Sequence, residues 1–171
     1  MQLYLKLLTI KNANQKYVGW LNDYEVVKFT EQRFYKHKLL SVKKFIKDKI
    51  NSKNEFLYGI FLYKKEKKKT HHIGNIKLGP INFIHKYAEI SYFIGEKSFW
   101  NKGYATKAIK KMIYIAKKNY RIKKLIAGCY ENNIGSIKAL KKNLFLQEGK
   151  LRSHFIFEKK RCNSLIFGRK I

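Results

Sequence analysis

A fifteen-residue stretch from Ile94 to Ala108 contains the clearest chemical pattern in this chain. Residues 88–94 have the β-branched and aromatic content of a strand, and apolar residues from Ala105 onward recur with the period of a helix. Gly103 lies between the two. A glycine directly before a helix lets the backbone approach a ligand, and the unpaired N–H groups and dipole of the helix favour an anion. The pattern therefore predicts a pyrophosphate site.

The elements that position this loop alternate along the chain. We predict strands over residues 3–10, 55–63, 72–78, 87–94, 125–130, 146–157 and 165–169, and helices over residues 14–29, 42–50, 105–118 and 134–142. Ser41 is predicted to cap the second helix, and the lysine-rich segment 64–69 to form a hairpin turn. No cluster of Pro, Gly or Ser marks a linker, so we expect a single domain over residues 1–171.

The composition limits the classes of partner. The formal net charge is +28, but only five of the 39 basic residues are arginines, the residue that base readout and bidentate phosphate contacts favour. We therefore expect no specific nucleic-acid partner, although the positive field should attract anionic ligands. The lysine excess is also what a coding bias toward A and T would produce.

The location and redox state follow from what the sequence lacks. No apolar run approaches the roughly 20 residues that span a bilayer, and residues 1–6 lack the order of a signal peptide. We expect a cytoplasmic protein without a membrane partner. Cys129 and Cys162 are too few for a disulfide framework and have no metal-ligand spacing, so both are expected to be reduced packing residues.

Four segments in order resemble the GNAT superfamily of acyl-CoA N-acetyltransferases. Residues 100–106 resemble the tryptophan-glycine-x-glycine-tyrosine-alanine loop of the branch that acetylates ribosomal-protein amino termini, with Asn101 where that branch often has glycine. Residues 88–94, 131–140 and 145–152 resemble the splayed strand, the asparagine-x-x-serine helix start and the segment that follows it. The resemblance implies an α/β GNAT fold with a mixed, mainly antiparallel sheet, splayed between strands 87–94 and 125–130 and flanked by helices.

The resemblance also implies acetyl-CoA as co-substrate and no metal. The backbone from Asn101 to Thr106 would hold the pyrophosphate, and the strand before it would pair with the pantetheine arm. The residues implied at the cofactor are Tyr92, Phe93, Ile94, Trp100, Asn101, Lys102, Gly103, Tyr104, Ala105, Thr106, Asn133 and Ser136.

Within the superfamily, the chain is most similar to a group often found beside genes for amino-sugar and surface-polysaccharide synthesis. Residues 20–23, 72–81 and 127–130 and His85 carry this likeness. It implies a small-molecule acceptor, the amine of a nucleotide-linked amino-deoxy sugar, and allows a homodimer. Protein amino-terminal or polyamine acetylation, and a non-catalytic basic binding module, are the alternatives. The candidate acceptor residues are Trp20, Asn22, Glu25, Glu31, Arg33 and Asn75, although Trp20 also fits a core position and Arg33 a solvated one.

Acetyl transfer to an amine requires a base, because the protonated amine must lose a proton before it attacks the thioester. Glu89 is the first candidate and His85 the second. Glu89 fits equally well as a surface residue paired with a lysine, and a loop histidine is often only solvated. The acid is unassigned, because Leu140 stands where many GNAT enzymes have a tyrosine. Leu144 stands where relatives have glycine, so the sequence does not predict the conformation of this turn.

Overall fold

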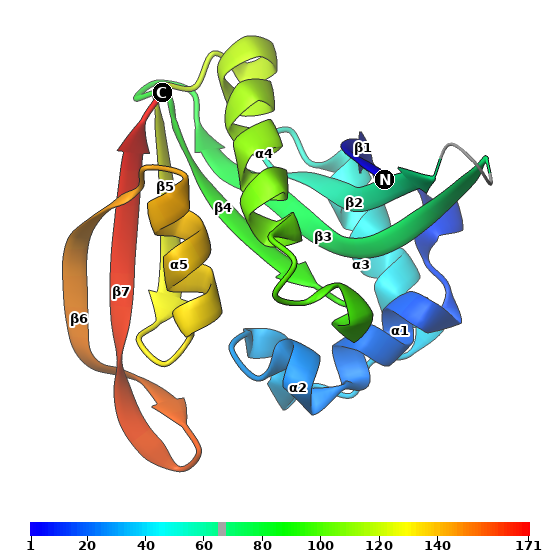
Figure 1. The fold of residues 1–171 in the computed structure, drawn as a ribbon, viewed down its shortest axis with the longest axis horizontal. Coiled ribbons are helices and arrows are strands. Elements are labelled where there is room, and N and C mark those ends of the chain that lie inside the picture. Colours follow the sequence, from blue (N-terminus) through cyan, green and yellow to red (C-terminus); the bar gives the residue numbers. More distant parts are fainter. Residues whose placement is uncertain (65–67) are drawn as a thin grey trace.

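A computed structural model describes residues 1–64 and 68–171. Within this part of the chain, seven strands form one sheet in the order β1-β2-β3-β4-β5-β7-β6 (Figure 1). The strands are β1 (Gln2–Leu7), β2 (Phe56–Lys64), β3 (Lys69–Asn82), β4 (Tyr87–Ile94), β5 (Lys124–Tyr130), β6 (Leu146–Phe157) and β7 (Lys160–Lys170). The α-helices are α1 (Gln15–Asn22), α2 (Tyr24–Val27), α3 (Leu39–Asn51), α4 (Tyr104–Tyr120) and α5 (Ile134–Lys142), with 3-10 turns η1 (Ile10–Asn12), η2 (Glu31–Phe34) and η4 (Lys97–Phe99).

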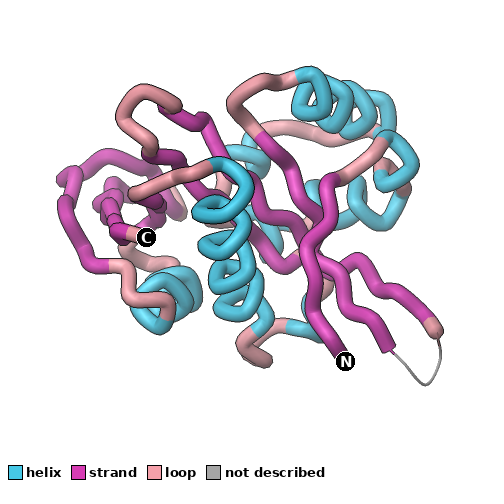
Figure 2. Tube along the Cα trace, turned by 90° about the horizontal axis from the view of Figure 1, so that it is seen from above, coloured by secondary structure: helices cyan, strands magenta, loops and turns pink. Residues whose placement is uncertain are grey.

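The sheet separates two layers of helices, as the view from above shows (Figure 2). One core cluster lies between the sheet and the α4–α5 layer, with Ile76, Ile109 and Leu140 fully buried. The other lies under α1 and α3 and contains Tyr17 and Val42. Because side chains alternate along a strand, even-numbered residues of β4 face α4 and α5, and odd-numbered ones face the α1 side.

The sheet opens between β4 and β5. These two strands are parallel, but among the described residues they pair only from Tyr87↔Lys124 to Glu89↔Ile126. Beyond Glu89, the β5-facing side of residues 90–94 has no strand partner, whereas β3 stays paired with β4 up to Ile94. The predicted fold class, a mixed and mainly antiparallel sheet with a splay at this pair and helices on its faces, is confirmed.

Several predicted boundaries need correction. The helix predicted over residues 42–50 is α3, which begins at Leu39. Ser41 therefore lies inside it, where its hydroxyl accepts a hydrogen bond from the Lys38 backbone at 3.0 Å. The last strand begins at Lys160 and not at Leu165, because β6 and β7 continue to pair, with bulges, up to Phe157↔Lys160. Strand β3 is longer than predicted, and the predicted turn at 64–69 lies partly outside the described residues.

Candidate active site

The glycine loop presents unpaired backbone N–H groups at the start of α4. Gly103 is the N-cap residue and adopts a left-handed conformation with φ of 73°, which glycine accepts without strain. Lys107 N–H bonds to the Gly103 carbonyl at 3.0 Å, so the N–H groups of residues 104–106 precede the first bond of the helix. Asn101 also has a positive φ, 57°. These groups can hold an anion at the positive end of the helix dipole.

Side chains of the loop fix its shape. The Trp100 indole donates a hydrogen bond to the Ile94 carbonyl at 2.7 Å, which ties the loop to the end of β4. Lys102 donates to the Ser98 carbonyl at 2.8 Å, and the Phe99 and Tyr104 rings meet edge to face. The implied cofactor residues of this segment therefore form one folded unit beside the open end of the splay.

The facing wall is the start of α5. Asn133 caps this helix, since its side-chain oxygen accepts from Ser136 N–H at 3.1 Å. The Ser136 hydroxyl lies 2.8 Å from the Tyr92 hydroxyl, so a side chain of β4 reaches across to α5. Phe93 points to the other face, where it packs with Tyr17. The structure brings Tyr92, Asn133 and Ser136 together and leaves only the backbone of Phe93 toward the opening.

Glu89 stands at the last rung before β4 and β5 separate. Its side chain is exposed on the α1 face, and no described lysine or arginine lies within ion-pair distance. His85 lies in the turn before β4, exposed, with its backbone N–H bonded to Asn82. That turn is at the closed end of the strand pair, so the structure brings Glu89 to the opening and does not bring His85 there.

A hydrogen-bond network joins η2, the end of β5 and the β6–β7 hairpin. Arg33 donates from Nη1 to the Tyr130 hydroxyl at 2.9 Å and from Nη2 to the Ile156 carbonyl at 2.6 Å. The Tyr130 hydroxyl donates to a Glu31 carboxylate oxygen at 3.0 Å. Arg33 also bonds the Lys28 carbonyl, so it joins η2 to the β6–β7 hairpin rather than standing free for an anionic acceptor. Tyr130 was not among the predicted site residues, although its place at the end of β5, on the face of Glu89, was an available signal.

Aromatic rings line the same region. Tyr130 stacks on Phe155 with centroids 3.9 Å apart, and Phe29 stacks on Phe157 at 4.9 Å. Burial raises the pKa of the Tyr130 hydroxyl, although Arg33 opposes this. The network and rings bring together segments far apart in the sequence, from α2–η2, β5 and the last hairpin.

Four other predicted acceptor residues lie elsewhere or are occupied. Trp20 is buried and packs under the loop, because a Cβ on Gly95 would lie 2.2 Å from its ring. Asn75 is only 2% exposed; its oxygen lies 2.8 Å from His72 Nε2, and its amide nitrogen has no described partner. The remaining two have local partners, Asn22 with the His37 backbone and Glu25 with Lys28.

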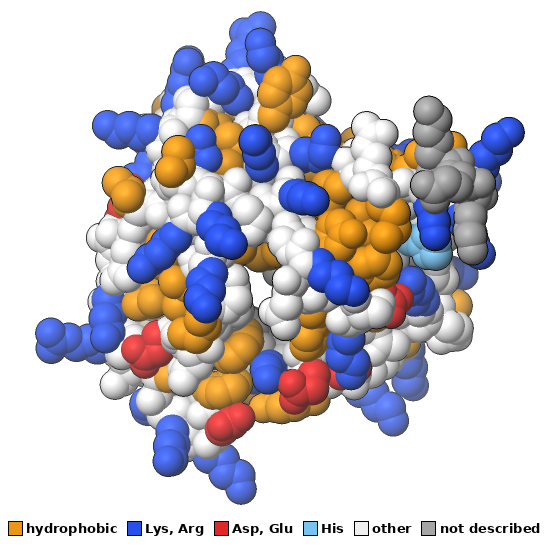
Figure 3. Space-filling model, viewed as in Figure 1, with side chains coloured by type: hydrophobic (Ala, Val, Ile, Leu, Met, Phe, Trp, Pro, Cys, Tyr) orange, Lys and Arg blue, Asp and Glu red, His pale blue; other side chains and the backbone are white. Residues whose placement is uncertain are grey.

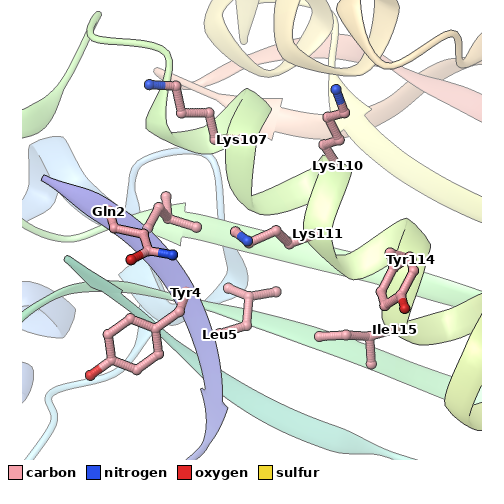
Figure 4. A pocket seen from close by; sticks show the side chains of 9 residues that line it. Gln2, Tyr4, Leu5, Lys107, Lys110, Lys111, Tyr114 and Ile115 are labelled. Atoms are coloured by element: carbon pink, nitrogen blue, oxygen red, sulfur yellow. The ribbon is translucent and has the colours of Figure 1, made fainter. Parts of the chain in front are cut away.

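The surface is hollowed between α4, α5 and α2 (Figure 3). Acidic side chains gather below this hollow, whereas lysine and arginine side chains are scattered over the rest of this face. A cavity of about 520 Å³ lies beside α2 and η2, lined by Tyr24, Phe34, Tyr35 and Lys36 among others. Another groove of about 620 Å³ lies between β1 and α4 and contains Leu5 and Ile115 under three lysines (Figure 4). That groove has no carboxylate or histidine in its lining and is separate from the splay.

Two departures from the family pattern have structural outcomes. Leu140 is fully buried in the core, so its position supplies no hydroxyl. Leu144 adopts a φ of 58°, a conformation that costs a non-glycine residue about 1 kcal/mol or more. The turn therefore persists despite the missing glycine.

In residues 1–64 and 68–171, no three His, Cys, Asp or Glu side chains are grouped as a metal site would require. In the same part of the chain, no helix has the length and apolar content to cross a bilayer.

A sheet that opens between two parallel strands, with a glycine loop at the start of the next helix, has a free strand edge and an anion site that an acyl-CoA requires. Residues 2–145 match the acetyltransferase (GNAT) domain family, and the chain belongs to that family. Its class is therefore that of N-acetyltransferases with acetyl-CoA as co-substrate. The comparison with curated proteins found no match.

Solved structures with the same fold include two cofactor complexes. One is the ribosomal-protein α-N-acetyltransferase RimL with coenzyme A, with a TM-score of 0.86 and 16% identity, covering 100% of this chain and 95% of that chain. The other is the spermidine N-acetyltransferase of Vibrio cholerae with CoA and spermine, with a TM-score of 0.84 and 18% identity, covering 99% and 95%. These likenesses establish the fold.

Proposed function

We propose that this enzyme transfers the acetyl group of acetyl-CoA to a primary amine in the splay between β4 and β5, with Glu89 as the base. The observation that carries the proposal is the state of Glu89: in a chain of net charge +28, this carboxylate has no described ion-pair partner and stands at the vertex of the opening. A carboxylate kept free of lysines can accept a proton from an incoming amine.

The donor would lie along the open side of β4. Its pantetheine arm would add to the free edge of residues 90–94 as an extra strand, and its pyrophosphate would meet the N–H groups of residues 104–106. A backbone N–H of β4 would bear the thioester oxygen as negative charge develops on it. Asn133 and Ser136 form the opposite wall.

The reaction then proceeds by direct attack. Glu89 takes a proton from the ammonium group, the amine nitrogen bonds to the carbonyl carbon, and the carbon–sulfur bond breaks with its electron pair on sulfur. The second proton of the new amide nitrogen leaves to water. His85 has no part in this scheme, because its turn lies at the closed end of the strands.

For the acceptor we propose the amine of a nucleotide-linked amino-deoxy sugar. The cavity beside α2 and η2 supports it, because exposed rings of Tyr24, Phe34 and Tyr35 can stack on a base and Lys36 can meet a phosphate. The positive field of the whole chain favours an anionic acceptor over a polycation.

A polyamine or a protein amino terminus is the second candidate. It is favoured by the acidic side chains below the hollow in Figure 3. Glu31 and Glu89 also have no described ion-pair partner. The V. cholerae enzyme named above holds spermine, and RimL is named for a protein substrate. The same two kinds of acceptor, a polyamine and a protein amino terminus, are therefore the alternatives for this chain.

The test is a thiol-release assay with acetyl-CoA and three acceptors: nucleotide-linked amino sugars, spermidine, and a peptide with a free amino terminus. We expect turnover with the amino sugars, confirmed by the mass of the acetylated product. Turnover of only spermidine, or of only the peptide, would show that the proposed amino-sugar acceptor is wrong. Absence of acceptor-dependent thiol, together with no thermal stabilisation by acetyl-CoA, would leave a non-catalytic basic binding module instead.

A further inference from the structure

A pair of hydroxyl groups spans the splay on its α4–α5 side. The Tyr92 hydroxyl lies 2.8 Å from Ser136 Oγ and 3.4 Å from the Ser136 carbonyl. Tyr92 is three residues beyond the last paired rung, about 10 Å along the strand. Its side chain crosses from β4 to the first turn of α5, so its hydroxyl lies over the gap through which the donor arm must pass.

Expulsion of a thiolate creates negative charge that a positioned donor can stabilise. Two other side chains near this side of the opening cannot supply a strong donor. Leu140, one turn after Ser136, is apolar and fully buried. Burial raises the pKa of the Cys129 thiol to about 11, and a thiol is a weak hydrogen-bond donor.

We propose that the Tyr92 hydroxyl, oriented by Ser136, donates a hydrogen bond to the sulfur of the departing coenzyme A. This inference rests on the proposed function. As the carbon–sulfur bond breaks, the electron pair stays on sulfur, the hydrogen bond stabilises that charge, and the thiolate takes a proton from water after release. Tyr92 keeps its own proton throughout and requires no regeneration.

The surroundings of Tyr92 suit this role. Burial raises the pKa of its hydroxyl, which Ser136 only partly opposes, so the group stays protonated across the range in which the amine acceptor reacts. Ser136 is itself fixed, because its backbone N–H is bonded to Asn133 Oδ1. The donor is therefore held in place before the cofactor arrives, and little reorganisation is needed at the moment of reaction.

The first experiment replaces Tyr92 by phenylalanine, which keeps the ring and removes the hydroxyl. We expect kcat to fall about 30- to 300-fold, as for loss of one donor to a developing charge, while the Kd of acetyl-CoA changes less than about threefold. Tyr120→Phe is the matched control, because it removes a partly buried hydroxyl with a 2.8 Å bond to Tyr58 away from the opening. Its kcat should equal that of the wild type.

The second readout is the thiol of bound coenzyme A, followed by thiolate absorbance with the desulfo analogue as blank. A donor to sulfur favours the thiolate, so Tyr92→Phe should raise the pKa of this thiol by about one unit. Ser136→Ala, which releases the Tyr92 hydroxyl, should shift it in the same direction by less. If Tyr92→Phe does not fold, the thiol pKa measured with Ser136→Ala tests the role of Tyr92.

The outcomes separate this inference from the function beneath it. A wild type without acceptor-dependent turnover refutes the proposed function. A wild type that turns over, with a Tyr92→Phe variant within twofold in kcat or with an unchanged thiol pKa, refutes the role of Tyr92 alone. A lower kcat with the thiol pKa unchanged makes the hydroxyl a packing group only.

Discussion

The two sides of the opening are built in different ways. The donor side consists mainly of backbone groups from one continuous segment, from the free edge of β4 to the N–H groups after Gly103. The acceptor side consists of side chains from separate segments: Glu89, the Glu31–Arg33 turn, Tyr130 and the tip of the β6–β7 hairpin. Backbone geometry tolerates sequence change, whereas a side-chain network depends on each member. The scaffold can therefore keep its donor while its acceptor changes.

Two ion pairs join these sides. Lys97, in the segment leading to the glycine loop, lies 2.6 Å from Asp23 at the start of α2. Glu96 lies 2.7 Å from Lys16 of α1. Both pairs are partly exposed, so each is expected to contribute little to stability. Because the donor side and the acceptor side consist of different groups, we expect a variant on one side to affect only one of the two substrates.

The largest expected effect is on the acceptor side, from Glu89→Gln. Loss of the base should lower kcat/KM for the acceptor about 10²- to 10³-fold and leave the Kd of acetyl-CoA unchanged. Asp48→Asn is the matched control, since Asp48 is an exposed carboxylate on α3 without a described ion pair. Steady-state kinetics at saturating acetyl-CoA gives the answer. Full activity of the glutamine variant would remove Glu89 from the mechanism.

The next effect is on the donor side, from Gly103→Val. A β-branched residue at a φ of 73° is strained and would displace the N–H groups of the following turn. The KM for acetyl-CoA should rise about tenfold or more, equivalent to loss of one or two charge-assisted hydrogen bonds, with the acceptor KM unchanged. Gly19→Ala, where an added Cβ has nothing within 4 Å, should behave as wild type. A larger change in the KM of the acceptor than in the KM of acetyl-CoA would contradict the assignment of Gly103 to the donor side.

A smaller effect is expected from Tyr130→Phe. The ring stays stacked on Phe155, but Arg33 loses an acceptor and Glu31 a donor. Loss of these two hydrogen bonds, at about 0.5 kcal/mol each, should raise the acceptor KM about fivefold and leave the KM of acetyl-CoA as it is. Initial rates at varied acceptor measure this. Equal changes in both constants would mean that Tyr130 supports the fold and not the acceptor side.

The smallest effect concerns the link between the two sides. Lys97→Met should lower the free energy of unfolding by about 0.5 kcal/mol at neutral pH. The hydrogen bond from Lys97 holds the pKa of Asp23 below its usual value. This contribution is therefore present above the unfolded pKa and is lost as the pH falls through the folded one. Urea denaturation at neutral and acid pH, with and without salt, should show the difference vanish in acid; a difference that persists there would need another cause.

The donor side was predictable from the sequence because its signal is local. Gly103 next to a helical period specifies a turn, a helix start and exposed N–H groups within a few residues. The order of the strands and of the longer helices was predicted for the same reason, but the helix predicted over residues 14–29 is divided at Asp23 into α1 and α2. The predicted helix start at Ser41 was wrong because a serine hydroxyl can act in two ways near a helix start. It can cap the helix itself, or it can lie inside the first turn and bond back to the residue before the helix, as Ser41 does with Lys38.

The acceptor side could not be predicted because it depends on tertiary contacts. Arg33 and Tyr130 are 97 positions apart, and no local pattern indicates that the guanidinium would bond a hydroxyl and a hairpin carbonyl. For Trp20 the sequence left a stacking role and a core position open, and the core position is confirmed, because the ring is buried against Gly95. The charge total likewise concealed a local gathering of acidic side chains beside the hollow.

The most direct test is a crystal structure of the protein with acetyl-CoA. We expect the pyrophosphate within hydrogen-bond distance of the N–H groups of residues 104–106, the pantetheine arm along residues 90–94, and the thioester carbonyl between β4 and β5 with Glu89 on its acceptor side. Cofactor bound in the β1–α4 groove under Lys107, Lys110 and Lys111, with the splay empty, would contradict the account.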